Sequence, residues 1–204
     1  MEDSTGATRT NRPVDGLALW EEGGEGPGAD LAVIRLDQNE RLLVPFTTTL
    51  LPMVLHYLDY PSLQGYVQCN GPGCLLCRVG RQQEKRDVWP LYDILEKSVG
   101  VLLISPNQRP HSLRRLLLPV FRRLAGGEGP LLLSLRKDGS KFSGSTLPLP
   151  EAADHGAAAI RTFLEQVEAG QVDLGSPLQK LADADLAMIE EIKVLMVAKG
   201  ITLG

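Results

Sequence analysis

The sequence predicts a mainly β protein with helices (α+β), in which short strands form a small β-barrel and a helical segment follows. Residues 16–150 hold several short apolar runs that are separated by Gly- and Pro-containing turns, with one helical pattern among them. This texture favours a barrel over a parallel α/β sheet. Residues 151–204 have the texture of helices. Residues 1–15 are polar, and we expect them to be disordered.

The first strands are expected between residues 17 and 46. The stretch GLALWEEGGEGPGADLAVIRL indicates a short strand, a Gly-rich turn and a second strand over 31–36. The tetrapeptide DQNE has turn chemistry, and RLLVPF (41–46) is typical of a returning strand. The second and third strands are therefore expected to pair as a hairpin.

A buried strand, a helix and a second hairpin complete the expected barrel. The run VGVLLIS (99–105) is continuously apolar, which predicts a buried strand. The stretch HSLRRLLLPVFRRL (111–124) predicts a helix with its arginines on one face, kinked or split at Pro119. The stretch LLLSLRKDGSKFSGSTLPL (131–149) predicts a hairpin that turns at Asp138-Gly139.

The C-terminal quarter is expected to be a helical appendage to the barrel. The stretch EAADHGAAAIRTFLEQVEAG predicts a helix that ends at Gly170. The stretch SPLQKLADADLAMIEEIKVLMVAKG predicts one or two further helices, capped by Ser176 and ended by Gly200. Its acidic run DADLAMIEE is expected to form a solvated helix face.

Composition and termini place the chain in a broad class. A hydrophobic fraction of 43% over 204 residues is enough for a packed core. The sequence has no apolar run of the ~18 residues that a membrane span needs, and its N-terminus has no apolar signal-peptide core. We therefore expect a cytoplasmic protein, where clustered cysteines are more often metal ligands or catalytic groups than disulfides.

The charges of the chain are segregated. The net charge is −4, but residues 78–141 contain 13 Lys and Arg against 6 Asp and Glu, while the remainder contains 8 against 19. A basic middle within an acidic whole suggests a surface for a polyanion. The alternative is that the basic side chains coat the outer face of the 111–124 helix.

All three cysteines lie close together in the chain, in a loop rich in Gly and Pro. His56 is followed by 12 residues and Cys69, then by 4 residues and Cys74, then by 2 residues and Cys77. An odd cysteine count does not suit a disulfide framework, whereas a structural zinc site needs four thiolate or imidazole ligands. His56 is the nearest candidate for the fourth ligand, and His111 and His155 are the others.

Three other interpretations of this cluster stay open at the level of sequence. The thiols could be unrelated buried side chains beside a surface histidine. The Cys74-x-x-Cys77 pair could be a redox or catalytic dithiol, although no βαβ pattern surrounds it. The metal could also be a catalytic zinc with an open coordination position.

The pattern His-x12-Cys followed by Cys-x-x-Cys resembles the zinc subdomain of the single-stranded-DNA-binding protein of T-even bacteriophages. The surroundings are similar too: RLLVPF precedes the histidine, RDVWPLYDILEKSVGVLLIS follows the cysteines, and LRKDGSKFSGSTLPL looks like the family's last hairpin. The resemblance covers residues 31–150. It implies an OB-type barrel over 16–150, with an inserted zinc subdomain around 56–80 and four zinc ligands, His56, Cys69, Cys74 and Cys77.

The chain departs from that family at three places. The gap between Cys69 and Cys74 is shorter, the N-terminal segment is not a basic helix-forming arm, and the C-terminus is not an acidic tail. The resemblance therefore does not extend to cooperative binding or to recruitment of partners by a tail.

Non-specific binding of single strands combines basic side chains with aromatic rings on which bases stack. Aromatic and basic side chains cluster around the expected barrel and metal loop, and we expect the metal loop to order the basic residues that follow it. The candidate nucleic-acid-binding residues are Tyr57, Tyr66, Arg81, Lys85, Arg86, Trp89, Tyr92, Arg114, Arg115, Arg122, Arg123, Arg136, Lys137, Lys141 and Phe142.

The sequence thus predicts a zinc-containing protein that binds single-stranded DNA without sequence preference and acts in replication, recombination or repair in a phage or mobile element. Its partners would be single-stranded DNA and replication or recombination proteins, and no catalytic residues are expected, because no enzyme motif is present. The alternative is a zinc-stapled adaptor whose C-terminal helices dock a partner protein. A zinc-dependent hydrolase is a third interpretation.

Overall fold

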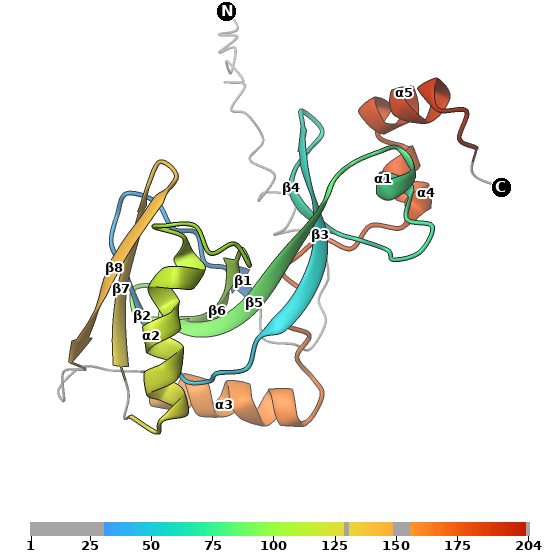
Figure 1. The fold of residues 1–204 in the computed structure, drawn as a ribbon. Coiled ribbons are helices and arrows are strands. Elements are labelled where there is room, and N and C mark those ends of the chain that lie inside the picture. The colour runs from blue at the N-terminus through green and yellow to red at the C-terminus, as the bar shows by residue number, and fades with distance from the viewer. Residues whose placement is uncertain (1–30, 129–130, 149–155, 203–204) are drawn as a thin grey trace, which may run out of the picture.

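A computed structural model of the chain describes residues 31–128, 131–148 and 156–202 (Figure 1). These residues form one sheet and five helices, in an α+β arrangement. In chain order the elements are β1 (Ala32–Val33), β2 (Arg41–Val44), β3 (Leu51–Tyr60), β4 (Leu63–Gln68), α1 (Leu75–Arg78), β5 (Gln83–Asp93), β6 (Ser98–Ile104), α2 (Leu113–Ala125), β7 (Leu131–Asp138), β8 (Lys141–Pro148), α3 (Ala157–Glu168), α4 (Asp183–Ala187) and α5 (Glu190–Ala198).

The sheet has eight strands and is mostly antiparallel. Its main path runs β1-β6-β5-β2-β7-β8, and only β1 and β6 pair in parallel. β3 pairs with β5, and β4 extends the sheet beyond β3. Among the described strands nothing joins β1 to β8, so the sheet is open, and closure into the expected barrel is not seen.

β5 links the β3–β4 hairpin to the rest of the sheet. Its first half, Gln83–Val88, pairs with β3, and its last residues, Tyr92 and Asp93, pair with β2. Along its other edge it pairs with β6 over seven residue pairs. Lys85 and Arg86 are therefore ordered by the sheet, so the prediction that the metal loop orders the basic residues after the cysteines is wrong for them. Arg81, in contrast, precedes β5 and donates from its backbone to the Leu76 carbonyl at 2.8 Å.

Helices cover both faces of the sheet. Side chains alternate along a strand, so Trp89 and Leu91 on β5 point to one face of the sheet and Tyr92 points to the other. On the first face they pack with β6, β7 and the buried side of α2. On the second face Tyr92 packs with Phe163 of α3. Figure 1 shows α2 and α3 lying against different sides of the strands.

The end of the chain returns to the β3–β4 hairpin. Leu186 of α4 and Ile192 of α5 are fully buried in a cluster with Leu58, Leu75 and Leu76. Gln179 forms an isolated parallel bridge with Val67 of β4. The C-terminal helices are thus part of a second core, rather than the appendage that the sequence predicted (Figure 1).

Several predicted elements are confirmed. The buried strand at 99–105 is β6, the hairpin at 131–149 is β7–β8, and the helix that ends near Gly170 is α3. The β7–β8 turn uses Gly139-Ser140, one residue later than expected, because Asp138 pairs with Lys141. α2 runs unbroken through Pro119, so the predicted helix is not split.

Other element predictions are wrong. The expected hairpin between 31–36 and 41–46 does not form, because β1 pairs with β6 while β2 pairs with β5 and β7. Ser176 caps no helix, because the next helix, α4, begins only at Asp183. The predictions for residues 1–15 and for the short strand before residue 31 concern residues outside the described ones.

None of the helices in the described ranges combines the length and the apolar character that crossing a bilayer requires.

The core position of Trp89 gives the first testable expectation. Its indole is fully buried, and its ring centroid lies 4.4 Å from that of Phe121 on α2, with the ring planes tilted by 35°. Nε1 donates to the Thr47 carbonyl at 2.8 Å. Trp89→Ala should therefore lower the free energy of unfolding by about 3–5 kcal/mol, as measured by chemical denaturation. Trp89→Phe, which keeps an aromatic ring, should cost less, and a loss below about 1 kcal/mol for the alanine variant would contradict this packing.

Candidate metal centre

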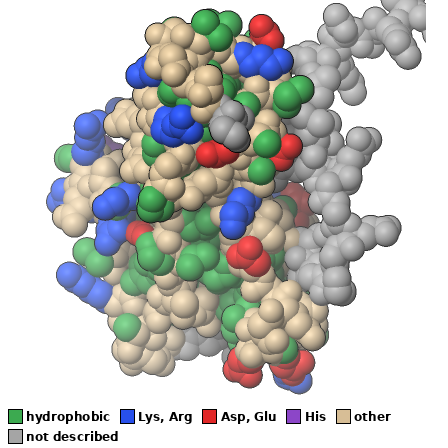
Figure 2. Space-filling view, turned by 90° about the vertical axis from the view of Figure 1, so that its right-hand side faces the viewer, with side chains coloured by type: hydrophobic (Ala, Val, Ile, Leu, Met, Phe, Trp, Pro, Cys, Tyr) green, Lys and Arg blue, Asp and Glu red, His purple; other side chains and the backbone are tan. Residues whose placement is uncertain are grey.

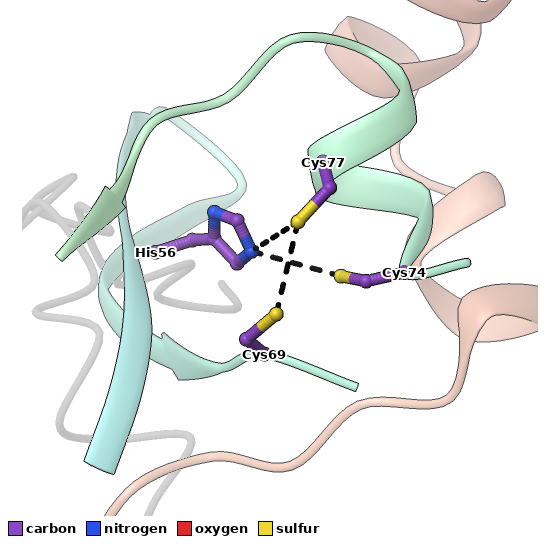
Figure 3. Close-up of side chains that lie close together, drawn as sticks. All are labelled: His56, Cys69, Cys74 and Cys77. Atoms are coloured by element: carbon purple, nitrogen blue, oxygen red, sulfur yellow. Dashed lines mark hydrogen bonds between the residues drawn. The ribbon is translucent and has the colours of Figure 1, made fainter. Parts of the chain in front are cut away.

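Four side chains from three elements meet at one point (Figure 3). His56 comes from β3, Cys69 directly follows β4, Cys74 is the N-cap residue of α1, and Cys77 lies within α1. Their ligand atoms, three Sγ and the His56 ring nitrogen, all lie within 4.8 Å of one another. The three cysteines are free, so no disulfide competes for the sulfurs.

Local backbone geometry explains why these side chains converge. His56 points to the same face of the sheet as its direct partner Gln83 on β5, because paired residues of antiparallel strands share a face. Gly71 and Gly73 have φ values of 81° and 86°, a region that L-residues rarely adopt, and they fold the chain back between Cys69 and Cys74. The Cys74 N–H then donates to the Gly71 carbonyl at 3.1 Å.

Three distances between the ligand atoms match the edges of a zinc tetrahedron. With Zn–S bonds of about 2.3 Å and Zn–N bonds of about 2.0–2.1 Å, tetrahedral edges measure about 3.8 Å between sulfurs and about 3.6 Å between sulfur and nitrogen. The Cys69 and Cys77 Sγ atoms are 3.7 Å apart. His56 Nε2 lies 3.6 Å from Cys74 Sγ and 3.5 Å from Cys77 Sγ.

Hydrogen bonds around the site prepare these atoms for a metal. His56 Nδ1 lies 3.1 Å from the Gln82 carbonyl, which can only accept, so Nδ1 carries the proton and Nε2 keeps its lone pair. The Gln83 side-chain amide donates to Cys77 Sγ at 3.1 Å and to Cys69 Sγ at 3.4 Å. These bonds fix the imidazole and stabilise negative charge on sulfur.

The site shifts the pKa values of three of its side chains. Burial lowers the pKa of His56, which favours the neutral ring that binds metals. Burial, together with the neighbouring Cys69 sulfur, raises the pKa of Cys77 to about 11. Against the effect of burial, hydrogen bonds from Gly71, Cys77 and Gln83 lower the pKa of Cys69. A divalent cation at the site would favour the ionised forms of Cys69 and Cys77.

The donor set is compatible with zinc. Three thiolates and one imidazole in tetrahedral arrangement suit Zn²⁺ and fill its four preferred positions. Of the two other candidate histidines, His111 is exposed and outside the cluster, and His155 lies outside the described residues. The predicted ligand set His56, Cys69, Cys74 and Cys77 is therefore the set that the fold brings together.

Sequence reasoning missed three residues of this site. Gln83 contacts two sulfurs, and Asn70 and Asp183 connect the loop to the C-terminal segment. Gln83 could be found only from the β3–β5 register. Asp183 lies in the acidic run that was expected to be a solvated face, and its partner Leu75 is 108 residues away in the chain. No local sequence pattern marks it.

Two of the candidate stacking residues are buried. Trp89 is 0% exposed and Tyr92 is 2% exposed, so neither ring offers a face to a base in this structure. Both are core residues of β5, and their assignment as nucleic-acid contacts is corrected. Tyr57 is the most exposed of the aromatic candidates, at 45%, whereas Tyr66 and Phe142 are half-buried.

The candidate arginines of α2 do not act as one face. Arg114 pairs with Asp87 of β5 at 2.7 Å, and Arg123 pairs with Glu128 at 2.6 Å on the opposite side of the helix. Arg115 and Arg122 are exposed between them and form no ion pair with the described residues. Two of the four arginines are therefore available to an anion.

The remaining candidate cations are dispersed over the molecule. Arg81 lies over the Tyr60 ring, Arg86 pairs with Glu84, and Lys137 lies over Phe142. Arg136 donates to Ser143 at 3.0 Å, and the others are exposed: Lys85 and Lys141. On the face shown in Figure 2, Lys and Arg side chains stand apart, with acidic side chains among them and hydrophobic side chains near the middle.

Comparison of the chain with protein-family models, with curated proteins and with solved structures finds no match.

The geometry predicts one zinc ion per chain. Cys74→Ser and His56→Ala should each abolish stoichiometric zinc binding, because each removes one of four ligands, while the matched control His111→Ala should keep it. Metal analysis of the purified variants measures this directly. A His56→Ala protein that retained one tightly bound zinc would show that the imidazole is not a ligand.

Proposed function

We propose that the protein binds single-stranded DNA without sequence preference, and that His56 and the three cysteines hold a structural zinc ion. The observation that carries the proposal is a cluster of two tyrosines and an arginine on β3, β4 and β5, on the sheet face opposite the metal site, in which the Tyr57 ring is exposed. We call this cluster, formed by Tyr57, Tyr66 and Arg86, the tyrosine platform.

The tyrosine platform has the components that base stacking requires. Tyr57 and Tyr66 are directly paired across β3 and β4, and their rings meet edge to face at a centroid distance of 5.2 Å. The Arg86 guanidinium lies 5.1 Å from the Tyr66 ring centroid and donates to its hydroxyl at 2.6 Å. An exposed ring that is held by a second ring and an arginine offers a π-face that every base can use.

The metal site and the tyrosine platform share one strand. His56 and Tyr57 are neighbours on β3, so their side chains project from opposite faces. A metal that fixes His56 therefore also fixes the backbone that presents Tyr57. With four protein ligands, the zinc ion would serve this structural purpose and have no open position for catalysis.

Phosphate contacts would come from the cations that are not neutralised by the described residues. Among the candidate residues, five such side chains are exposed: Lys85, Arg115, Arg122, Arg136 and Lys141. They belong to the basic stretch 78–141, and they lie on different elements, which suits a flexible strand better than a rigid duplex. The acidic remainder of the chain would limit binding to that stretch.

The sequence resemblance to the T-even phage single-stranded-DNA-binding proteins supports the same proposal. It rests on the histidine spacing, the Cys-x-x-Cys pair and the last hairpin, β7–β8. In this proposal the curved sheet belongs to the OB type, and the protein acts in DNA replication, recombination or repair. The different C-terminus argues against the family's tail-mediated partner recruitment.

A second candidate function is docking of a partner protein on α4 and α5. Met188, Val194 and Val197 are 72%, 61% and 82% exposed, which is unusual for large apolar side chains on a short segment. This observation favours the zinc-stapled adaptor, in which nucleic acid plays no part.

Fluorescence anisotropy with a labelled polypyrimidine strand tests the proposed function. We expect tighter binding of the single strand than of a duplex of equal length. We also expect affinity to fall with salt, by a log–log slope of about −0.7 for each phosphate contacted. Equal affinity for both forms, or no binding at low salt, would reject the proposal and favour the adaptor.

The tyrosine platform gives the matched variants. Tyr57→Ala should weaken single-strand binding by about 1–3 kcal/mol, the cost of losing one stacked base, whereas Tyr57→Phe keeps the ring and should bind almost normally. Val197→Ala on α5 serves as a control that changes an exposed apolar side chain far along the chain. Equal affinities for Tyr57→Ala and Val197→Ala would remove Tyr57 from the interface.

A further inference from the structure

The short helix α1, which carries Cys77, has no capping side chain of its own. Its N-cap residue is Cys74, whose side chain makes no capping hydrogen bond. The sulfur of Cys74 points instead toward His56 Nε2, 3.6 Å away (Figure 3). A residue that binds the metal at this position cannot also satisfy the free N–H groups that every helix start exposes.

Asp183, the first residue of α4, supplies the missing cap. Its Oδ2 accepts a hydrogen bond from the Leu75 backbone N–H at 3.1 Å, and its Oδ1 accepts one from the Asn70 side-chain amide at 2.8 Å. Leu75 directly follows Cys74, and Asn70 directly follows Cys69. One carboxylate therefore holds the chain beside two of the four candidate ligands.

The charge of Asp183 suits this position. A carboxylate near the first N–H groups of a helix interacts favourably with the positive end of the backbone dipoles, and hydrogen bonds to an ionised acceptor are stronger than neutral ones. Asn70 also donates to the Leu181 carbonyl at 2.9 Å. The loop between Cys69 and Cys74 is thus attached to the C-terminal segment at several points.

Polar contacts along β4 extend this attachment. The Gln68 backbone N–H donates to the Gln179 carbonyl at 2.8 Å. The Gln68 side chain donates to the carbonyls of Gly175 and Leu178, at 2.9 and 2.8 Å. Residues 175–183 therefore form a strap along the last residues before Cys69, which we call the C-terminal strap.

Apolar packing adds to the polar contacts. Leu186 and Ile192 are both fully buried, and they pack in the same cluster as Leu75, Leu76 and Val79 of the metal loop. Cys74 itself is 1% exposed within this cluster. The hydrophobic core beneath the metal site is thus built partly from residues more than 100 positions later in the chain.

We propose that the C-terminal strap with α4 and α5 is a component of the metal centre, and that Asp183 is the positioning residue that sets the metal affinity. By capping α1 and holding Asn70, Asp183 fixes the peptides that present Cys69, Cys74 and Cys77. Because binding equilibria are reciprocal, the metal in turn stabilises the docked C-terminal segment, and loss of the metal loosens it.

Zinc affinity of the full-length protein, measured by competition with a chromophoric chelator, tests the proposal. Asp183→Ala should weaken zinc binding about 10- to 100-fold, the usual effect of removing a partner outside the ligand shell. Asp183→Asn keeps an acceptor oxygen without the charge and should lose less. The matched control is Asp185→Ala, because Asp185 is an exposed acid on the same helix with the same charge. Equal zinc affinity for Asp183→Ala and Asp185→Ala would overturn the proposal.

Hydrogen exchange followed by mass spectrometry gives a second readout that does not need a variant. Removing zinc from the wild-type protein with a chelator should speed exchange in residues 175–202 and in α1, while β6 and β7 stay protected. Unchanged exchange in residues 175–202 would overturn the coupling. Neither experiment contains nucleic acid, so the coupling can fail or succeed independently of the proposed DNA-binding function.

Discussion

The part of the molecule that holds the β3–β4 hairpin, the cysteine loop and α1 depends on one constraint. This constraint is the convergence of His56, Cys69, Cys74 and Cys77 on one point. Three sulfurs and an imidazole nitrogen lie within 4.8 Å of one another, and three of their separations, at 3.5–3.7 Å, match the edges of a zinc tetrahedron. Three crowded thiols, one buried and two partly buried, are favoured by a cation that binds their ionised form. Binding of a structural metal is also folding energy, so the hairpin, the cysteine loop and α1 become one unit when it is present.

The rest of the sheet, with α2 and α3, is stabilised by hydrophobic packing. Trp89 and Leu117 belong to a core in which α2 covers one face of the sheet, and Phe163 brings α3 to the other face. β5 belongs to both parts, because Gln83 at its start contacts the cysteine sulfurs while Trp89 further along lies in the core. Loss of the metal should therefore affect β5 without unfolding the sheet.

The sequence predicted those features that local chemistry determines. The four candidate ligands were found because a structural metal site needs specific donors at short spacing, and the β7–β8 hairpin was found because Gly139 permits its tight turn. Strand partners were harder to predict, since β1 pairs with β6 across more than 60 residues. The side chains of Trp89 and Tyr92 show a related limit, because composition alone cannot separate a core aromatic from a stacking platform. Asp183 illustrates the strongest limit, since its role depends entirely on a fold that returns the C-terminus to the metal loop.

These features combine into one physical account. In the proposed arrangement, a metal ion would hold β3 from one face, the tyrosine platform occupies the other face, and the C-terminal strap with Asp183 would complete the support of the metal loop. The central claim is the ligand set. X-ray absorption spectroscopy of the zinc-loaded protein tests it most directly: the account predicts three sulfur neighbours at about 2.3 Å and one nitrogen at about 2.0–2.1 Å. A shell dominated by nitrogen and oxygen, or fewer than three sulfur neighbours, would contradict it.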